Sequence, residues 1–229
     1  MQNVIITGAS GNLGRAAVEK FLSLDYTVIA TVSPGKRLGY ETNSPVDVHE
    51  LDLTNESAVQ LFTTRVMQAY GSIHAVILLA GGFAAGNYSE TDQALLSKMY
   101  KLNFETAYLV TKPIFDLMLH QPNGGRIIFI GSRPSLLANQ GKNSIAYALS
   151  KSLLFKLAEF LNAEGKSYKV VTTVVVPSTI DTPQNRSSMP DADFKKWVTP
   201  ASIAETFAFL CSEEGSTLRE PIMKIYGDA

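Results

Sequence analysis

The sequence contains a single cysteine, Cys211, among its 229 residues. One thiol cannot build a disulfide framework or a thiolate metal cluster. The three histidines, His49, His74 and His120, are scattered along the chain, so their spacing predicts no metal site either. Long hydrophobic runs are also missing, since the longest ones, such as residues 170–176, are far too short to cross a bilayer.

A strong charge of either sign is absent as well. The chain has 20 lysine and arginine residues against 21 aspartate and glutamate residues, a net charge of −1, and no basic block. Binding to nucleic acid or to an acidic membrane surface therefore has no electrostatic support. The first strand is expected almost at Met1, with no room for a signal peptide before it, so the sequence predicts a soluble, cytoplasmic protein.

The composition that remains is that of a globular domain, with 45% hydrophobic and 18% charged residues. Strands are predicted at residues 4–6, 26–32, 46–51, 74–79, 126–130, 169–176 and 221–226, and helices at 16–22, 56–70, 92–120, 145–163 and 200–212. Thr54 is expected to cap the helix 56–70, Pro113 to kink or break the helix 92–120, and residues 177–199 to be irregular. This alternation predicts a single α/β domain over residues 1–229, a Rossmann-type, doubly wound parallel sheet of about seven strands with helices on both faces.

A glycine-rich stretch joins the first strand to the first helix. Gly8, Gly11 and Gly14 follow the apolar residues 4–6 and precede a segment with helical periodicity. Strand, glycine turn and helix form the geometry in which backbone N–H groups at a helix N-terminus face a phosphate. The stretch therefore favours dinucleotide binding, although a plain turn between strand and helix is the alternative.

Tyr147 and Lys151 lie four residues apart and hence on one face of the predicted helix 145–163. A free tyrosine has a pKa of about 10, and a nearby lysine cation is expected to lower that pKa and make the phenol a usable acid or base. A surface pair without chemistry is the alternative interpretation.

Two further polar residues are placed for chemistry. Ser132 comes just after the fifth predicted strand, where its hydroxyl can bond a substrate oxygen, and Ser135 competes with it for that role. The alignment of the strand favours Ser132. Asn103 lies inside a predicted helix, where a residue of weak helix propensity needs a reason.

Taken together, these motifs resemble the short-chain dehydrogenase/reductase family. The resemblance rests on Thr7-Gly8-x5-Gly14, Asn103, Ser132 and Tyr147-x3-Lys151, and it covers essentially the whole chain. It implies a nicotinamide cofactor and a homodimer or homotetramer through the helices around residues 104–119 and 152–161. It implies Tyr147 as general acid or base, Lys151 as the group that lowers its pKa and binds the ribose, Ser132 as the residue that polarises a carbonyl, and Asn103 as the holder of a relay water.

The resemblance also implies a set of cofactor-binding residues along the carboxyl ends of the strands. In it, Asp52 lies by the adenine ring and Thr182 holds the nicotinamide carboxamide. The set is Gly8, Ser10, Asn12, Leu13, Gly14, Ser33, Lys36, Arg37, Asp52, Leu53, Ala80, Gly81, Tyr147, Lys151, Pro177, Ile180 and Thr182. The chain departs from the family pattern in four places. Three are substitutions: Asn12 for a glycine, Leu78-Leu79-Ala80-Gly81 for Asn-Asn-Ala-Gly, and Ser178 for the glycine after Pro177. The fourth is a Ser132 that lies slightly farther from Tyr147 than in most members, which makes Ser135 a competing candidate.

The end of the second strand predicts the type of cofactor. A carboxylate there would bind the adenosine ribose and repel a 2′-phosphate. Residues 31–37 contain no acid and two cations, Lys36 and Arg37, so NADP(H) is favoured over NAD(H). The alternative is that both cations are simply solvated loop residues.

Residues 80–87 and 181–194 show a narrower resemblance to dihydropteridine reductases. Phe83 in the first of these stretches could stack on a planar ring. The retained Ser132 and Asn103 point instead to a carbonyl substrate. The leading prediction is an NAD(P)-dependent reductase acting between a small carbonyl and its alcohol. A pterin reductase is one alternative. A dinucleotide-binding sensor without catalysis is another, although intact Asn103, Ser132, Tyr147 and Lys151 speak against it.

Overall fold

The computed structural model describes residues 2–228 and contains one parallel sheet of seven strands in the order β3-β2-β1-β4-β5-β6-β7. Every pairing in it is parallel. The strands are β1 (Asn3–Thr7), β2 (Thr27–Val32), β3 (Asp47–Glu50), β4 (Ala75–Leu78), β5 (Gly125–Ile130), β6 (Val170–Pro177) and β7 (Ile222–Ile225). The doubly wound fold predicted from the alternating pattern is therefore confirmed.

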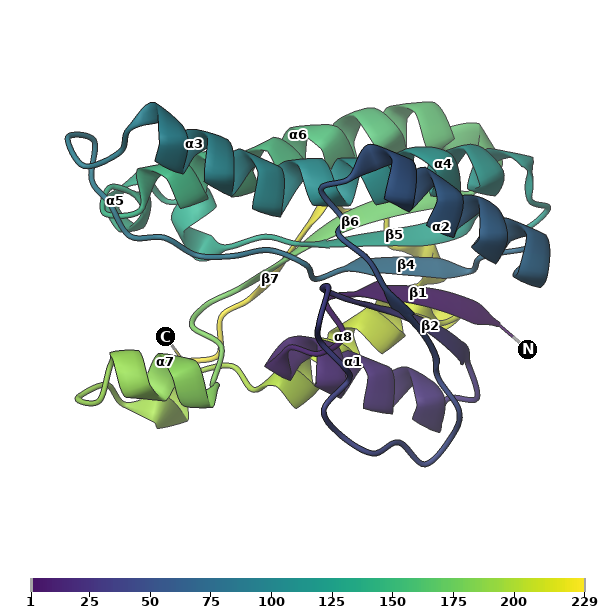
Figure 1. Cartoon of the computed structure of the whole chain (residues 1–229), viewed down its shortest axis with the longest axis horizontal. Helices are drawn as coiled ribbons and strands as arrows, with labels where there is room; N and C mark the ends of the chain where they lie inside the picture. Colours follow the sequence, from purple (N-terminus) through teal and green to yellow (C-terminus); the bar gives the residue numbers. More distant parts are fainter. Residues whose placement is uncertain (1, 229) are drawn as a thin grey trace.

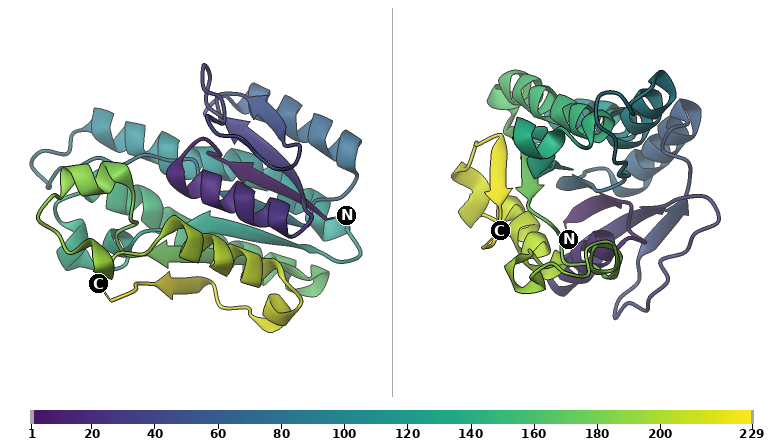
Figure 2. Two further views of the ribbon diagram at one scale, coloured as in Figure 1. Left: turned by 90° about the horizontal axis from the view of Figure 1, so that it is seen from below. Right: turned by 90° about the vertical axis from the view of Figure 1, so that its left-hand side faces the viewer.

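Helices cover both faces of the sheet, as Figures 1 and 2 show. On one face α1 (Asn12–Ser23) packs beside α8 (Pro200–Cys211), and a buried core including Phe21 and Phe207 lies between them and the strands. On the other face lie α2 (Glu56–Tyr70), α3 (Gln93–Tyr100), α4 (Thr106–His120) and α6 (Ile145–Gly165). Strands buried on both faces explain why their sequences are continuous apolar runs.

The segment predicted as one helix over 92–120 is interrupted, but not at Pro113. Helix α4 continues through Pro113 without a break, although the proline cannot donate a backbone hydrogen bond there. The interruption is a π-helical turn at Lys101–Glu105, between α3 and α4. The Thr106 hydroxyl donates to the Leu102 carbonyl at 2.8 Å within that turn.

Two other local predictions were wrong. The cap of α2 is Asn55, whose Oδ1 accepts from the Ala58 N–H at 3.1 Å. Thr54 instead donates through its hydroxyl to Asp52 at 2.8 Å. The segment 177–199 is not wholly irregular, since it contains α7 (Pro183–Ser188) and a 3-10 turn at Phe194–Lys196. A second short helix that the sequence did not signal, α5 (Ala138–Gly141), precedes α6.

The carboxyl ends of all seven strands lie along one edge of the sheet because every pairing is parallel. The direction of strand progression reverses between β1 and β4, which are neighbours in space. Ligands of such sheets bind beyond the carboxyl ends at this reversal. Across residues 2–228, no helix is long and apolar enough to span a membrane.

Candidate active site

The glycine turn after β1 is fitted closely against the end of β4. Gly8 has φ +67°, and a Cβ there would lie 2.9 Å from the Ala80 nitrogen. A Cβ on Gly14 would overlap the Gly8 carbonyl oxygen. The Ala9 N–H donates to the Thr31 carbonyl at 3.0 Å, which ties the turn to β2. These positions require glycine because of backbone conformation and close packing.

Thr7 supplies a polar link at the end of β4, where Leu78 and Leu79 stand in place of the two asparagines of the family pattern. Its hydroxyl oxygen accepts from the backbone N–H groups of Leu79 at 3.0 Å and Ala80 at 3.2 Å. The end of β4 is thereby held against the end of β1. The ends of β1 and β4 are therefore hydrogen-bonded to each other although Leu78 and Leu79 replace the two asparagines of the family pattern.

The N-terminus of α1 suits a phosphate. Its capping position is Gly11, with no side chain that bonds the first turn and no acidic residue in that turn, as far as the described residues go. By contrast, side chains of Asn55, Asp92 and Thr199 accept from the first turns of α2, α3 and α8. First-turn N–H groups that no side chain covers, together with the helix dipole, favour an anion at α1.

Asn103 is buried in the π-helical turn, and its side chain is hydrogen-bonded to Gly82 after β4, to Ser150 on α6 and, at 3.8 Å, to Met99 Sδ. Its Oδ1 accepts from the Gly82 N–H at 2.9 Å, and its Nδ2 donates to the Gly82 carbonyl and to Ser150 Oγ, each at 3.0 Å. These hydrogen bonds explain why Asn103, a residue of weak helix propensity, occurs inside the predicted helix. Both amide protons are used within the protein, so a relay water would have to bond the second lone pair of Oδ1 or a backbone group.

Gly81 leaves space between Asn103 and Lys151. A Cβ on Gly81 would lie 2.5 Å from Asn103 Oδ1 and 3.4 Å from Lys151 Nζ. Asn103 cannot move aside without losing its bonds to Gly82. Gly81 therefore has no side chain on the side that faces Lys151, so a ligand could approach its backbone closely there.

Lys151 is buried, with 5% of its surface exposed. Its Nζ donates to the Ile130 carbonyl at 2.9 Å, at the end of β5. Burial lowers the pKa of Lys151 to about 8, because the cation loses hydration. An ammonium has three protons, and this bond uses one of them, which fits a group that also bonds ligand hydroxyls.

The pKa of Tyr147 is raised, not lowered as the lysine spacing predicted. Burial is the main cause, and a hydrogen bond with the Ser132 side chain acts in the opposite direction. Tyr147 and Lys151 do share one face of α6. Burial outweighs the bond to Ser132, and Lys151, whose ammonium is bonded to Ile130, is not among the groups that shift the pKa of Tyr147. Tyr147 is thus protonated at neutral pH in this structure.

The two candidate serines, Ser132 and Ser135, differ in burial although their hydroxyls are in contact. Ser132 is buried at the end of β5 and hydrogen-bonds with Tyr147. Ser135 is half-buried, and its hydroxyl lies 2.5 Å from Ser132 Oγ. Ser132 is thus the more buried of the two candidates, and its role beside a substrate stays a prediction.

The loop after β2 brings two cations to the adenosine end of the predicted groove. Lys36 and Arg37 are exposed and line a hollow of about 680 Å³ together with Val32, Tyr40 and Glu50. The Tyr40 hydroxyl donates to the Ala9 carbonyl at 3.1 Å, which links this loop to the glycine turn. Two acids that the sequence did not single out, Glu41 and Glu50, also line the hollow. The Glu50 carboxylate accepts from the Gly35 N–H at 2.8 Å.

The other predicted cofactor residues lie on the same edge of the sheet. Asp52 follows β3, and its carboxylate accepts from the Thr54 N–H and hydroxyl, which lowers the pKa of Asp52. Thr182 follows β6 and caps α7 by accepting from the Asn185 N–H at 3.2 Å. Pro177 is the last residue of β6. The remaining members follow the ends of β1, β2, β3, β4 and β6 in the chain: Ser10, Asn12, Leu13, Ser33, Leu53, Ala80 and Ile180.

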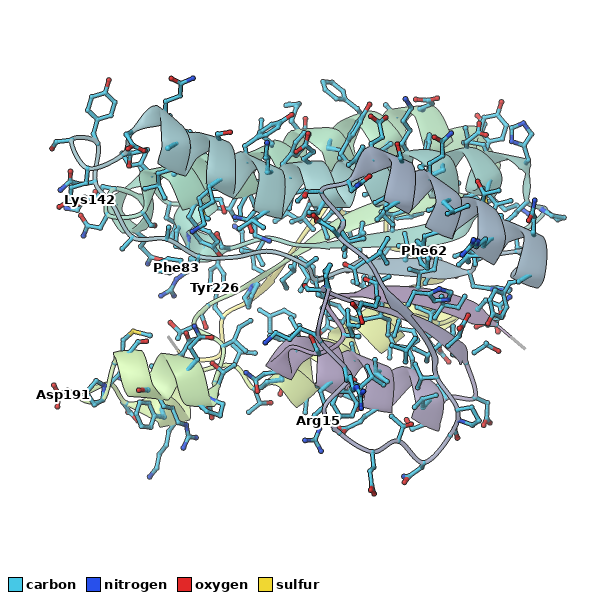
Figure 3. The ribbon with its side chains drawn as sticks, in the orientation of Figure 1. Arg15, Phe62, Phe83, Lys142, Asp191 and Tyr226 are labelled. Carbon is cyan, nitrogen blue, oxygen red and sulfur yellow. The ribbon has the colours of Figure 1, made fainter. Side chains whose placement is uncertain are left out.

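Phe83 covers Tyr147 from the loop between β4 and α3. The two rings meet edge to face with centroids 5.0 Å apart, while 68% of Phe83 is exposed. In Figure 3, Phe83 and Tyr226 both project on the α7 side of this loop. Gly82 is held by Asn103, and Gly86 is bonded to Asn143 and Ile145, so the loop is fixed on both sides of the ring.

Sequence reasoning missed Ser150 and Tyr40. Ser150 donates to the Tyr147 carbonyl at 2.8 Å and accepts from Asn103, so it joins two of the predicted residues. A serine directly before Lys151 carries no signal of that role. Among residues 2–228, no three histidine, cysteine or acidic side chains are grouped so that they could hold a metal ion.

Comparison with known proteins agrees with this geometry. The short chain dehydrogenase family model matches residues 2–193, and the chain belongs to this family. Acetoacetyl-CoA reductase of Acinetobacter sp. is 26% identical over 239 residues, covering 97% of this chain and 95% of that protein. Dihydropteridine reductase of Dictyostelium discoideum is 26% identical over 210 residues, covering 89% of this chain and 85% of that protein.

One relative is much longer than this chain. The uncharacterized oxidoreductase YuxG of Bacillus subtilis is 30% identical over 188 residues, which are 77% of this chain but 26% of that protein. Among solved structures, ElxO with NADP bound has a TM-score of 0.89 at 22% identity, covering 99% of this chain and 97% of that one. The fold is thus shared, and the chain is an oxidoreductase of a family that uses NAD(P).

Proposed function

We propose that this chain reduces a small carbonyl compound, with Tyr147 as the general acid. The observation that carries the proposal is the convergence of Tyr147, Ser132 and Lys151 at the end of β5. Ser132 hydrogen-bonds with Tyr147, and Lys151 bonds the carbonyl of Ile130, two residues before Ser132. The reaction adds a hydride to the carbonyl carbon and a proton to its oxygen.

The residues of the site fit a nicotinamide cofactor, which would supply the hydride when bound. The glycine turn and the uncovered first turn of α1 would hold the phosphates. The remaining protons of Lys151 would bond the ribose hydroxyls, next to the space that Gly81 leaves open. Tyr147 would donate its proton to the carbonyl oxygen, and Ser132 would bond the same oxygen and hold it in place.

Within this proposal NADP(H) is the preferred cofactor. Lys36 and Arg37 border the hollow at the end of β2, where a 2′-phosphate would lie. Asp52 is bonded to Thr54, and its lowered pKa keeps it an acceptor rather than a donor. The Dictyostelium relative and the exposed ring of Phe83 favour a second candidate, the reduction of a pterin.

Replacing Phe83 with leucine is expected to separate these substrates. Edge and face contacts between aromatic rings are worth about 0.5–1.5 kcal/mol beyond area burial, so KM for a planar ring should rise about twofold to tenfold. A saturated ketone of similar size should be affected less. Steady-state assays with NADPH, quinonoid dihydropterin, acetophenone and cyclohexyl methyl ketone give these ratios. Ketone turnover without pterin reduction would rule out the pterin candidate.

We also propose that the chain forms a homodimer or homotetramer through its long helices. Apolar side chains are exposed there, with Leu153 40% and Phe160 64% accessible on α6. A groove of about 370 Å³ between α3 and α6 is lined by Leu96, Tyr100, Leu149 and Leu153, among others. Contiguous apolar surface of this kind is typical of protein interfaces. A cytoplasmic location stays a prediction.

Charge placed on α6 should dissociate this assembly. Light scattering is expected to give two or four times 24.9 kDa for the natural chain, and a lower mass for the double variant Leu153→Glu and Phe160→Glu. Leu24→Glu is a matched control, because Leu24 is 44% exposed at the end of α1, on the opposite face of the sheet from α6 (Figure 1). A monomeric natural chain would contradict the proposal.

A further inference from the structure

Residues 178–198 form a lobe that follows β6 and carries α7 and a 3-10 turn. Figure 1 shows α7 on the side where the strands end, apart from α1 and α8. The two ends of the lobe are paired, because the Asp181 N–H donates to the Val198 carbonyl at 2.8 Å and the Val198 N–H donates to the Thr179 carbonyl at 3.0 Å. Thr182, which is predicted to hold the nicotinamide carboxamide, comes directly after Asp181 at this paired base.

The lobe is also braced internally. Arg186 on α7 forms a double hydrogen bond with Asp181, with an Nε–Oδ1 distance of 2.6 Å and an Nη2–Oδ2 distance of 2.8 Å. The guanidinium carbon of Arg186 lies 4.9 Å from the centroid of the Phe194 ring. The Asn185 side chain donates to the Ile180 carbonyl at 2.8 Å. Because these contacts hold its parts together, the placement of the whole lobe depends on how its base is attached to the sheet.

The base of the lobe is attached to the end of β7 and the residues after it. The Ser178 N–H donates to the Ile225 carbonyl at 2.9 Å, and the Ser178 hydroxyl donates to the Tyr226 carbonyl at 2.7 Å. Near the other end of the lobe, Gly227 has φ +59° and packs so closely that a Cβ would lie 3.0 Å from the Lys196 carbonyl oxygen. The chain after β7 therefore contacts the lobe both where it leaves the sheet and where it returns.

Tyr226 links this attachment to the proposed reacting centre. The guanidinium carbon of Arg133 lies 5.3 Å from the centroid of the Tyr226 ring, and Arg133 directly follows Ser132. The Nε of Arg133 also donates to the Gln140 side chain at 2.7 Å. Contacts therefore run from the lobe through Ser178 and Tyr226 to the turn that begins at Ser132.

We propose that Ser178 is a positioning residue for the cofactor, because its hydroxyl attaches the lobe to the end of β7 and the nicotinamide then binds against a lobe already in place. This inference rests on the proposed function and on the predicted contact between Thr182 and the nicotinamide. The family pattern has glycine at position 178, where the backbone bond to Ile225 could form but the hydroxyl bond to Tyr226 could not. Glycine would also add backbone freedom where the chain leaves the sheet. The serine therefore reduces the ordering of the lobe that cofactor binding has to supply.

Amide hydrogen exchange in the cofactor-free chain tests the attachment. In Ser178→Gly the amides of Asp181 and Val198 should exchange about threefold to thirtyfold faster, because they exchange when the base of the lobe opens and the hydroxyl bond no longer opposes that opening. Ser178→Thr keeps a hydroxyl and should retain the natural exchange. Ser188→Gly is the matched control, because the Ser188 hydroxyl donates to the Gln184 carbonyl at 3.0 Å within α7. Natural exchange at both amides in Ser178→Gly, or equal acceleration in Ser188→Gly, would overturn the inference.

Calorimetric titration with two ligands gives a readout that a general loss of stability would not produce. NADPH carries the nicotinamide, whereas 2′-phospho-ADP-ribose has the same adenosine and phosphates without it. In Ser178→Gly the Kd of NADPH should rise about twofold to fivefold, because only molecules with the lobe in place are ready to bind the nicotinamide. The Kd of 2′-phospho-ADP-ribose should stay unchanged, since the glycine turn, Lys36 and Arg37 lie outside the lobe.

Equal changes for both ligands, or no change for NADPH, would overturn the inference. A chain that binds neither ligand would refute the proposed function instead. The exchange measurement needs no ligand, so it still judges the attachment through Ser178 in that case.

Discussion

Replacing Tyr147 with phenylalanine is expected to lower kcat by about a hundredfold to ten-thousandfold, the usual contribution of a general acid. The variant removes only the hydroxyl that would give its proton to the carbonyl oxygen. The ring stays in place against Phe83. The dissociation constant of NADPH should change little, because Lys151 and the glycine turn bind the cofactor in this proposal. Single-turnover kinetics and a fluorescence titration of NADPH measure the two quantities separately.

The matched control is Tyr88→Phe, which removes a hydroxyl from a tyrosine that is 85% exposed. It should retain the natural rate. Since burial raises the pKa of Tyr147, the natural enzyme should remain active in reduction through neutral pH and lose activity only as Tyr147 ionises at higher pH. A Tyr147→Phe variant with the natural kcat would assign the acid to another group.

The double variant Lys36→Ala and Arg37→Ala is expected to weaken NADPH binding by about tenfold to a hundredfold for each cation that contacts the phosphate. Charge-assisted hydrogen bonds contribute about 1.5–3 kcal/mol each, and 1.4 kcal/mol corresponds to a factor of ten. NADH lacks the 2′-phosphate, so its dissociation constant should change much less. Both cations are exposed, so the difference should shrink as salt is added.

Two distant cations provide the control for this pair. Lys98 on α3 and Lys166 after α6 are both exposed, and Lys98→Ala with Lys166→Ala makes the same change in net charge. This control should leave the preference for NADPH over NADH intact. Equal losses for both cofactors in the Lys36 and Arg37 variant would mean that these cations do not read the phosphate. Glu50, which borders the same hollow, would then be the residue to examine for NADH preference.

The fold was predictable because its signals are local in sequence. Buried strands are recognised as apolar runs, and the glycine turn is recognised by the spacing of its glycines. Both can therefore be predicted without knowing the contacts between elements. The i, i+4 spacing placed Tyr147 and Lys151 on one helix face. It did not say that the ammonium would bond Ile130, or that burial would decide the pKa of the phenol.

The rest of the site depends on contacts between distant segments. The helix propensities of residues 101–105 do not predict the π-helical turn. In this turn Asn103 is hydrogen-bonded to Gly82 and Ser150, which are 21 and 47 residues away in the sequence. Pro113 was a sequence signal for a kink or break, and α4 continues through it without a break. The contact between the hydroxyls of Ser132 and Ser135 depends on the 3-10 turn that follows β5, which a list of candidate serines does not supply.

The central claim is that hydride passes from the cofactor to a carbonyl carbon while Tyr147 supplies the proton. The most direct test is reduction of acetophenone with NADPH deuterated at the reactive C4 position, followed by mass spectrometry and NMR of the product. The account predicts one deuterium on the carbinol carbon with the natural enzyme, and loss of that product by about a hundredfold or more with Tyr147→Phe. An alcohol formed without deuterium, or formed equally fast by Tyr147→Phe, would contradict it.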